Sequence, residues 1–261
     1  MKKFAVIFAL AFGLPYTTGV AAETISVGAS PVPHAEILEF VKPLVAKDGV
    51  ELKIVEFNDY VQPNLAVNDG QLDANYAVHR PYLQSLVKEH GLQNLKEVAG
   101  VHIEPMAVYS RTLTDITKVS EGAAVAIPND PTNGGRALLL LQKAGLITLE
   151  DPESITATPL DIKDNPKGLK FSELEPPQLP RSLDEVEIAV INTNFAIDAG
   201  LSPIKDSIFI ENKESPYVNL LIANTESAEK TGIKSLIKAL NSEDTRKFIT
   251  EKFEGAVVPA F

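Results

Sequence analysis

Cysteine is absent from the chain of 261 residues. Without a thiol, the protein cannot form a disulfide, a thiolate metal site or a cysteine nucleophile, and it offers no thiol for lipid attachment. We therefore expect a chain that has no lipid anchor and whose fold is stabilised by its hydrophobic core alone.

The motifs of common metalloenzymes and hydrolases are missing as well. The four histidines do not form HExxH, and no serine lies in a GxSxG motif. His79 and His102 could meet Glu104 in a mononuclear zinc site, but no spacing demands it. An exported metal-binding protein or a hydrolase therefore stays an alternative to the protein we expect, which has no catalytic residue, no cofactor and no metal.

Long apolar runs are missing beyond the first residues. Lys2 and Lys3 precede an apolar stretch from Phe4 to Leu14, and small residues at 20–22 precede Glu23. This layout is typical of a cleaved secretory signal, and the stretch is shorter than the ~20 residues that span a bilayer. We expect residues 1–22 to be removed and the mature chain to be soluble.

Positive charge is scarce. The chain has 24 lysines and arginines against 35 aspartates and glutamates, for a net charge of −11. Loss of Lys2 and Lys3 with a signal would make the balance more negative. Such a surface repels nucleic acid and anionic lipid, so neither is an expected partner.

Short apolar runs alternate with helical patterns along the rest of the chain. Strands are expected at 24–30, 50–57, 72–78, 106–110, 123–128 and 186–192, with amphipathic helices between several of them. This alternation predicts an α/β fold with mixed, mainly parallel sheets. Two such units in one chain suggest two lobes, and ligands of such sheets bind at the carboxyl ends of the strands.

The stretch NDPTNGGRALLLLQKAGL, at 129–146, predicts a loop that leads into a helix. Gly134 and Gly135 would let backbone amides approach an anion at the helix start. The planar fork of Arg136 suits a carboxylate. The alternative is an ion pair between Arg136 and an acidic side chain such as Asp130. The stretch lacks the Lys–Ser/Thr pair of a phosphate-binding loop.

Aromatic and imidazole side chains form a second group of candidates. In NYAVHRPYL, at 75–83, His79 and Tyr82 lie where a strand turns into a helix. Tyr60 and Tyr76 are candidates for pocket walls, since tyrosine has an apolar body and a polar tip. Each of these residues has an ordinary structural alternative, as a core aromatic or a hydrogen-bonded core histidine.

A third group consists of amides and one acid. Asn192 and Asn194 follow an apolar strand, and Asn219 lies in a later strand region. Asparagine offers a donor and an acceptor on a short arm, which suits a zwitterion, although it also favours turns. Glu104, just before a predicted strand, could meet an ammonium group.

Five motifs, read in chain order, resemble one family. NDPTNGGRALLLLQKAGL, QLPRSL, VINTNFA, ESPYVNL and the terminal GAVVPAF are similar to the MetQ/NlpA family, the substrate-binding proteins of methionine-uptake ABC transporters. The resemblance implies a two-lobed periplasmic-binding-protein fold (type II-like) with a ligand cleft between the lobes. One lobe would comprise residues 23–110 with 208–261 returning to it, and the other residues 111–207.

The resemblance also implies roles. Arg136 would hold the ligand carboxylate, with Asn192 and Asn219 on the amino and carboxylate groups. Tyr60, Tyr76 and His79 would surround the ligand side chain, and Glu104 would lie near the same cleft. The protein would be a periplasmic monomer that delivers L-methionine, or a closely similar amino acid, to an inner-membrane ABC permease with its ATPase subunits.

One segment departs from the family pattern. Many relatives read N-x-F-Q-H-x-P-Y-L, whereas this chain has Ala77 and Val78 at the phenylalanine and glutamine positions. Tyr76 cannot simply replace the missing ring, because neighbouring residues of a strand point to opposite faces. Losing the ring enlarges the pocket and removes a sulfur–aromatic contact worth ~0.3–1.5 kcal/mol. Another small amino acid, a methionine-containing dipeptide or a related metabolite is therefore an alternative ligand, and an interaction or folding-helper role without an amino acid is a further one.

Overall fold

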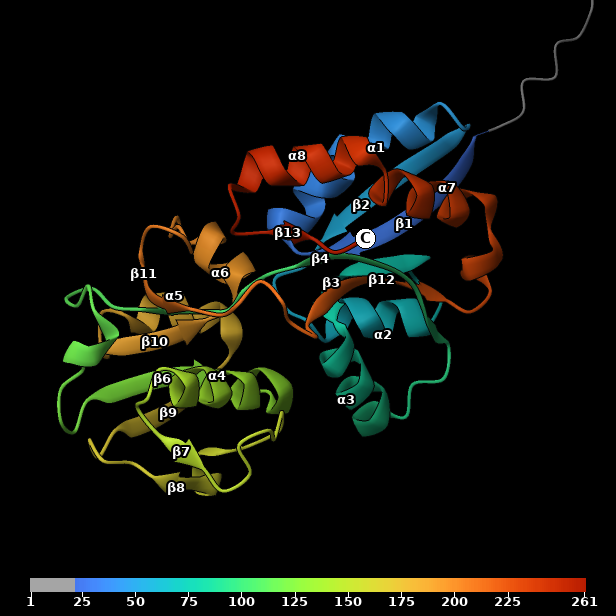
Figure 1. Cartoon of the computed structure of the whole chain (residues 1–261). Coiled ribbons are helices and arrows are strands. Elements are labelled where there is room, and N and C mark those ends of the chain that lie inside the picture. The colour runs from blue at the N-terminus through green and yellow to red at the C-terminus, as the bar shows by residue number, and fades with distance from the viewer. Residues whose placement is uncertain (1–21) are drawn as a thin grey trace, which may run out of the picture.

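The computed structural model describes residues 22–261, and it forms two lobes, each built on one main β-sheet (Figure 1). The predicted signal segment lies outside the described residues except for its last position. Among the described helices, none is both long and apolar enough to cross a membrane.

The first lobe contains a six-stranded sheet in the order β13-β4-β12-β3-β1-β2. Its strands are β1 (Glu23–Ala29), β2 (Val50–Glu56), β3 (Ala74–His79), β4 (Leu95–Ile103), β12 (Val218–Asn224) and β13 (Val258–Pro259). β1 pairs with β2 and β3 in parallel, whereas β12 and β13 make antiparallel pairs. The lobe also contains η1 (Pro31–Ala35), α1 (Glu36–Ala46), α2 (Gln62–Asn68), α3 (Arg80–His90), η5 (Ser227–Glu229), α7 (Thr231–Leu240) and α8 (Glu243–Phe253).

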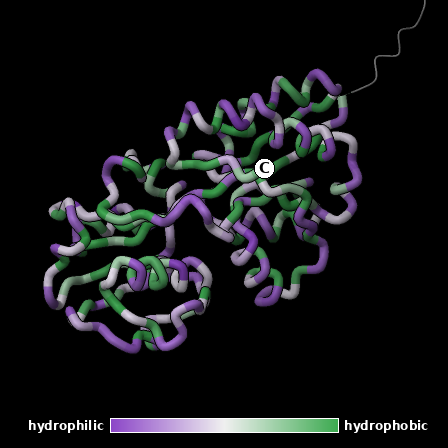
Figure 2. Tube along the Cα trace, in the orientation of Figure 1, coloured by the Kyte–Doolittle hydropathy of each residue, from purple (hydrophilic) through white to green (hydrophobic). Residues whose placement is uncertain are grey.

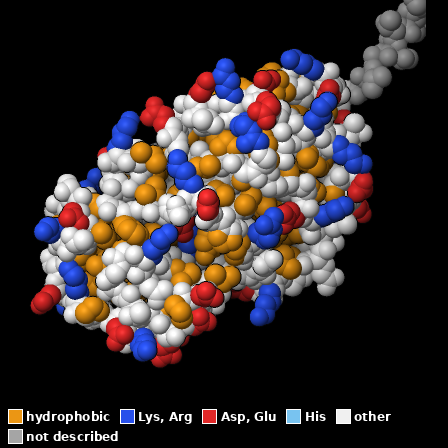
Figure 3. Space-filling model, in the orientation of Figure 1, with side chains coloured by type: hydrophobic (Ala, Val, Ile, Leu, Met, Phe, Trp, Pro, Cys, Tyr) orange, Lys and Arg blue, Asp and Glu red, His pale blue; other side chains and the backbone are white. Residues whose placement is uncertain are grey.

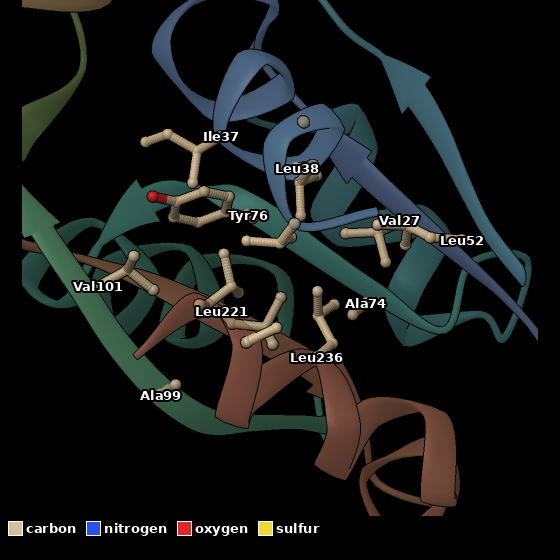
Figure 4. Packing of buried hydrophobic residues seen from close by; sticks show 14 of the residues in the cluster. Val27, Ile37, Leu38, Leu52, Ala74, Tyr76, Ala99, Val101, Leu221 and Leu236 are labelled. Carbon is tan, nitrogen blue, oxygen red and sulfur yellow. The ribbon is translucent and has the colours of Figure 1, made fainter. Parts of the chain in front are cut away.

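The core of the first lobe follows from simple periodicities. In α1, the buried residues Ile37, Leu38, Val41 and Val45 lie on one helical face. In β1, the side chains that face this core alternate along the strand. Both sets pack into a cluster that includes residues of β3, β12 and α7 (Figure 4).

The second lobe contains a five-stranded sheet in the order β11-β5-β10-β6-β9. Its strands are β5 (Ala107–Tyr109), β6 (Ala124–Pro128), β9 (Lys170–Leu174), β10 (Ile188–Ile191) and β11 (Ser207–Ile210). β6 pairs in parallel with β9 and β10, and β5 pairs antiparallel with β10 and β11. The other elements are η2 (Ile116–Lys118), α4 (Pro131–Lys143), β7 (Thr148–Leu149), η3 (Pro159–Asp161), β8 (Ile162–Asp164), η4 (Pro176–Gln178), α5 (Leu179–Ser182) and α6 (Thr193–Asp198).

The chain passes between the two sheets twice. One crossing is the short segment 104–106 between β4 and β5, and the other is the segment 211–217 between β11 and β12 (Figure 1). The crossings are bonded to each other, since Glu211 N donates to Met106 O at 2.9 Å and Met106 N donates to a Glu211 carboxylate oxygen at 3.0 Å. The predicted division into residues 23–110 with 208–261 and residues 111–207 stays a prediction.

Hydropathy and charge follow this architecture. Hydrophobic residues run along the strands, and the outer loops are mostly hydrophilic (Figure 2). On the face shown in Figure 3, positive and negative side chains are interspersed over both lobes.

Candidate ligand-binding site between the lobes

A small cavity lies between the lobes, with a free volume of only about 20 Å³. Much of its wall follows the carboxyl ends of β1, β3, β6 and β10. From the first lobe the wall includes His34, Tyr60, Ala77, Val78, His79 and Asn219. From the second lobe it includes Asn133, Arg136, Asn192, Thr193 and Asn194, and Glu104 of the first crossing completes it.

Arg136 is the cationic side chain of this wall, and it is held on one side by an acid. Its Nε and Nη2 donate to the two carboxylate oxygens of Glu211 at 2.8 and 2.5 Å. Nη2 also donates to Glu104 O at 2.7 Å, and the ring of Tyr217 lies 4.1 Å from the guanidinium carbon. Within residues 22–261, Nη1 makes no hydrogen bond, so one edge of the guanidinium is free to bind a ligand.

The segment around Gly134 and Gly135 does not form the anion site that was expected at the start of a helix. α4 begins at Pro131, so the glycines and Arg136 lie inside the helix rather than ahead of it. A Cβ on Gly134 would lie 2.9 Å from Pro128 O, and one on Gly135 would lie 2.4 Å from Ile155 O. The glycines therefore admit neighbouring backbone, not an anion.

Asp130, the acid considered as a partner for Arg136, has a different place. Its carboxylate caps α4 by accepting from Asn133 N at 2.9 Å and from Asn133 Nδ2 at 2.9 Å. An N-cap acid of this kind is a common way to satisfy the first amides of a helix. The expected ion pair of Arg136 exists, but Glu211 from the second crossing forms it.

Three polar residues form one side of the cavity. His79 Nδ1 accepts from Tyr82 N at 3.2 Å, so Nε2 carries the proton and donates to Asn133 Oδ1 at 3.0 Å. Asn192 Nδ2 donates to the same Asn133 oxygen at 2.9 Å. Asn192 Oδ1 is buried and has no partner among the described residues. It is thus an acceptor that a ligand ammonium group would satisfy.

A second hydrogen-bonded group surrounds Glu104. His102 Nε2 donates to Glu104 Oε1 at 2.7 Å, while its Nδ1 accepts from the Tyr76 hydroxyl. His34 Nε2 lies 3.0 Å from Asn219 Oδ1 and 3.3 Å from Glu104 Oε1. Both neighbours of His34 Nε2 are acceptors, so this nitrogen carries the proton. Asn219 keeps its Nδ2 donor unpaired within the described part of the chain.

The histidines of the site are neutral near pH 7. Burial lowers the pKa of His34 to about 4 and that of His102 to about 3. Burial, with the nearby Arg136 charge, lowers the pKa of His79 to about 3. Burial raises the pKa of Glu104, against the opposing charges near it. Arg136 forms its buried ion pair with Glu211 rather than with Glu104.

Sequence and structure comparisons identify the family. The family model described as NlpA lipoprotein matches residues 25–261. The chain belongs to the NlpA lipoprotein family. The D-methionine-binding lipoprotein MetQ of Escherichia coli (strain K12) is 46% identical over 218 residues, which are 82% of this chain and 80% of that protein. Lipoprotein 28 of the same strain is 43% identical over 244 residues, 92% of this chain and 89% of that protein.

Solved structures of the family agree with the fold described above. A nutrient-binding protein from Burkholderia cenocepacia bound to methionine is 43% identical, with a TM-score of 0.87 over 91% of this chain and all of that one. A periplasmic substrate-binding protein of an ABC transporter from Coxiella burnetii is 39% identical, with a TM-score of 0.85 over 90% of this chain. The prediction of a two-lobed periplasmic-binding-protein fold with mixed sheets is therefore confirmed.

The names of these NlpA relatives bear on one further prediction. They are called lipoproteins, whereas this chain has no cysteine. The expected absence of a lipid anchor does not agree with the word lipoprotein in the names of these relatives. For this chain, the absence of an anchor stays a prediction.

The residues predicted for the site come together in the cavity wall with one exception. Tyr76 is fully buried in the core of the first lobe (Figure 4), with its ring against that of His34 at a centroid distance of 4.8 Å. It lies behind the wall rather than in it. Strict strand alternation also fails next to it, because β3 has an irregularity opposite Leu220 and Leu221, and both Ala77 and Val78 line the cavity.

The alternative zinc site of His79, His102 and Glu104 does not form as such. His79 is bonded to Asn133, whereas His34 takes its place near His102 and Glu104, with the three possible ligand atoms within 4.8 Å of one another. His34, which lies in SPVPHAEIL just after β1, was not among the residues predicted for the site. Its position after the carboxyl end of a strand could have marked it as a site residue. The residues that follow it, however, have the pattern of an ordinary helix start.

Proposed function

We propose that this chain is the substrate-binding protein of an ABC importer and binds a free α-amino acid, methionine or one closely similar to it, in the interlobe cavity. The observation that carries the proposal is that three residues around this small cavity have hydrogen-bonding groups without a partner among the described residues. Arg136 Nη1 and Asn219 Nδ2 are donors for a carboxylate, and Asn192 Oδ1 is an acceptor for an ammonium group. A zwitterion satisfies all three at once.

The rest of the wall suits an aliphatic side chain. Tyr60, Ala77, Val78 and Tyr82 present mainly apolar surface to the cavity. Relatives named for D-methionine binding, and a relative solved with methionine, support methionine or an amino acid of similar size as the ligand. Another small amino acid or a methionine-containing dipeptide is the alternative within the same class.

The proposed cycle involves binding and release without chemical change of the ligand. Side chains of both lobes would contact the amino acid, so the ligand favours the closed arrangement over an open one. The closed protein would then deliver its ligand to an inner-membrane permease with its ATPase subunits. We propose that it does so in the periplasm as a monomer.

Calorimetric titration with L-methionine tests the role of Arg136. Arg136→Ala should weaken binding by about 2–5 kcal/mol, because a buried carboxylate loses its cationic partner. Arg111→Ala is the matched control, since Arg111 pairs with Asp184 on the surface and should leave affinity unchanged. Unchanged affinity of folded Arg136→Ala would refute the proposed carboxylate site.

Competition with a panel of amino acids and methionine dipeptides identifies the ligand within this class. Ala77→Phe should tighten methionine binding if the cavity is merely enlarged at this position, since a ring would refill the wall. Weaker binding of methionine by Ala77→Phe would favour a bulkier natural ligand.

A further inference from the structure

A second groove between the lobes, here called the rear groove, lies away from the ligand cavity. Its first-lobe wall is the end of α8 with the segment that leads to β13, and includes Phe253 and Ala256. Its second-lobe wall is the end of α6 with the loop that leads to β11, and includes Ile197, Leu201 and Ile204. The rear groove has a free volume of about 280 Å³, whereas the ligand cavity has only about 20 Å³.

The rear groove and the ligand cavity lie on opposite sides of the crossing segments. The crossings join the first lobe at β4 and β12; in the sheet, β13 lies beyond β4, and the cavity strands β3 and β1 lie beyond β12. Figure 1 agrees, since α6 and the end of α8 lie on one side of the crossings, and α3 and α4 lie on the other. A rotation of the lobes about the crossings that opens the cavity would therefore narrow the rear groove.

The structure has the cavity in its closed arrangement. Hydrogen bonds from Tyr60 to Asn194 and from His79 to Asn133 join the two lobes across it. These contacts leave little free space in the cavity, while the rear groove is open to solvent. The two lobes thus meet on the ligand side and are separated by a groove on the rear side.

The rear groove exposes apolar surface to water. Ile204 is 47% exposed, and it is one of four exposed large apolar side chains among the described residues. Ile197 already packs against the core of the first lobe, so the two walls are in contact at one point. Phe253 and Ala256 give the opposite wall an apolar surface that Ile204 could meet if the groove narrowed.

The charged groups beside the rear groove do not account for its width. Lys205 Nζ lies 3.6 Å from Glu254 Oε2, and this ion pair joins the two lobes. The two side chains are 73% and 72% exposed, and an ion pair in that environment contributes little to stability. The apolar surface is therefore the larger influence on whether the walls stay apart.

We propose that the rear groove sets the affinity for the ligand by stabilising the open arrangement of the lobes. When the lobes open, the walls approach and remove the side chain of Ile204 from water, which favours the open form. A ligand that closes the lobes must expose this surface again, so the observed affinity is lower than that of the closed form. The inference rests on the proposed opening and closing of the lobes, and it makes Ile204 a residue that tunes affinity without contacting the ligand.

Calorimetric titration with L-methionine tests the role of Ile204. Ile204→Gln removes apolar surface from the rear groove and leaves the cavity wall unchanged, and an exposed substitution of this kind alters the closed form little. The variant should bind methionine at least about threefold more tightly than the parent protein, because its open form is less stable.

Leu160→Gln is the matched control. Leu160 is 93% exposed in η3 of the second lobe, and it is not among the residues that line the rear groove or the cavity. Its substitution should leave affinity unchanged. Unchanged or weaker binding by folded Ile204→Gln would overturn the inference, and so would an equal gain of affinity in Leu160→Gln.

Small-angle X-ray scattering without ligand separates this inference from the proposed function. Ligand-free Ile204→Gln should have a smaller radius of gyration than the ligand-free parent, because more of it is closed, whereas Leu160→Gln should match the parent. Equal radii for the parent and Ile204→Gln would overturn the inference even if methionine binds. Failure of every amino acid to bind would instead refute the proposed function, and the scattering comparison would still decide the role of the rear groove.

Discussion

Replacing Glu211 with alanine removes the acid that holds the Arg136 guanidinium where the two crossing segments meet. The pair is buried, with side-chain exposures of 3% for Arg136 and 13% for Glu211. Breaking one partner of a buried ion pair leaves the other charge unpaired in a poorly solvated site. We therefore expect Glu211→Ala to destabilise the protein strongly even in the absence of an amino acid.

The expected size follows from the geometry. Loss of one partner of a buried pair costs about 3–5 kcal/mol. For a chain of this length, about 1 kcal/mol lowers the melting temperature by roughly 2–4 °C, so Glu211→Ala should lower it by roughly 6–20 °C. Arg136→Ala should cost more, because it also removes the bond to Glu104 O and the contact with the Tyr217 ring.

A double-mutant cycle isolates the pair. Thermal unfolding followed by circular dichroism, without added amino acid, should give a double variant less destabilised than the sum of the single variants, with a coupling energy above about 1.5 kcal/mol. The control is the surface pair of Arg111 and Asp184, exposed by 54% and 73%, which should couple by less than about 0.5 kcal/mol. Additive effects of the Arg136 and Glu211 substitutions would refute the buried-pair account.

Two further predictions concern stability. Gly135→Ala should lower the free energy of unfolding by about 1–3 kcal/mol, because its Cβ would lie 2.4 Å from Ile155 O; an unchanged urea midpoint would contradict this. The buried His34, His79 and His102 stay neutral in the folded protein down to pH about 4, 3 and 3, whereas unfolded histidine takes up a proton near pH ~6.5. Their contribution to the free energy of unfolding is therefore complete above pH ~6.5 and decreases as the pH falls toward 4. In His79→Gln, the free energy of unfolding should change less steeply with pH over this range.

Local patterns were sufficient for much of the architecture. The alternation of strands and helices predicted the α/β class, and the carboxyl ends of strands indicated the loops that form the cavity. The antiparallel strands β5 and β12 follow the two crossings of the chain, which no local pattern reports. Two α/β units in one chain already suggested two lobes, and the resemblance to a family supplied the type of fold.

The candidate site was predicted in part, for physical reasons that differ among residues. Arg136 and Asn192 stand beside recognisable motifs. Glu211 was missed because its partner lies 75 positions away in the sequence, and nothing near it marks a buried acid. Tyr76 was misplaced because strand position alone does not tell which face of a sheet meets the cavity.

Two hydrogen bonds already join the lobes across the cavity. Tyr60 Oη donates to Asn194 Oδ1 at 2.6 Å, and His79 Nε2 donates to Asn133 Oδ1 at 3.0 Å. These two bonds stabilise the closed arrangement of the lobes, and they do so whichever ligand is bound. At about 1 kcal/mol each, the two bonds would slow the opening of the lobes by a factor of roughly thirty for every ligand. Residence time inside the protein is thus set partly by bonds between protein groups, in addition to the contacts that the ligand makes.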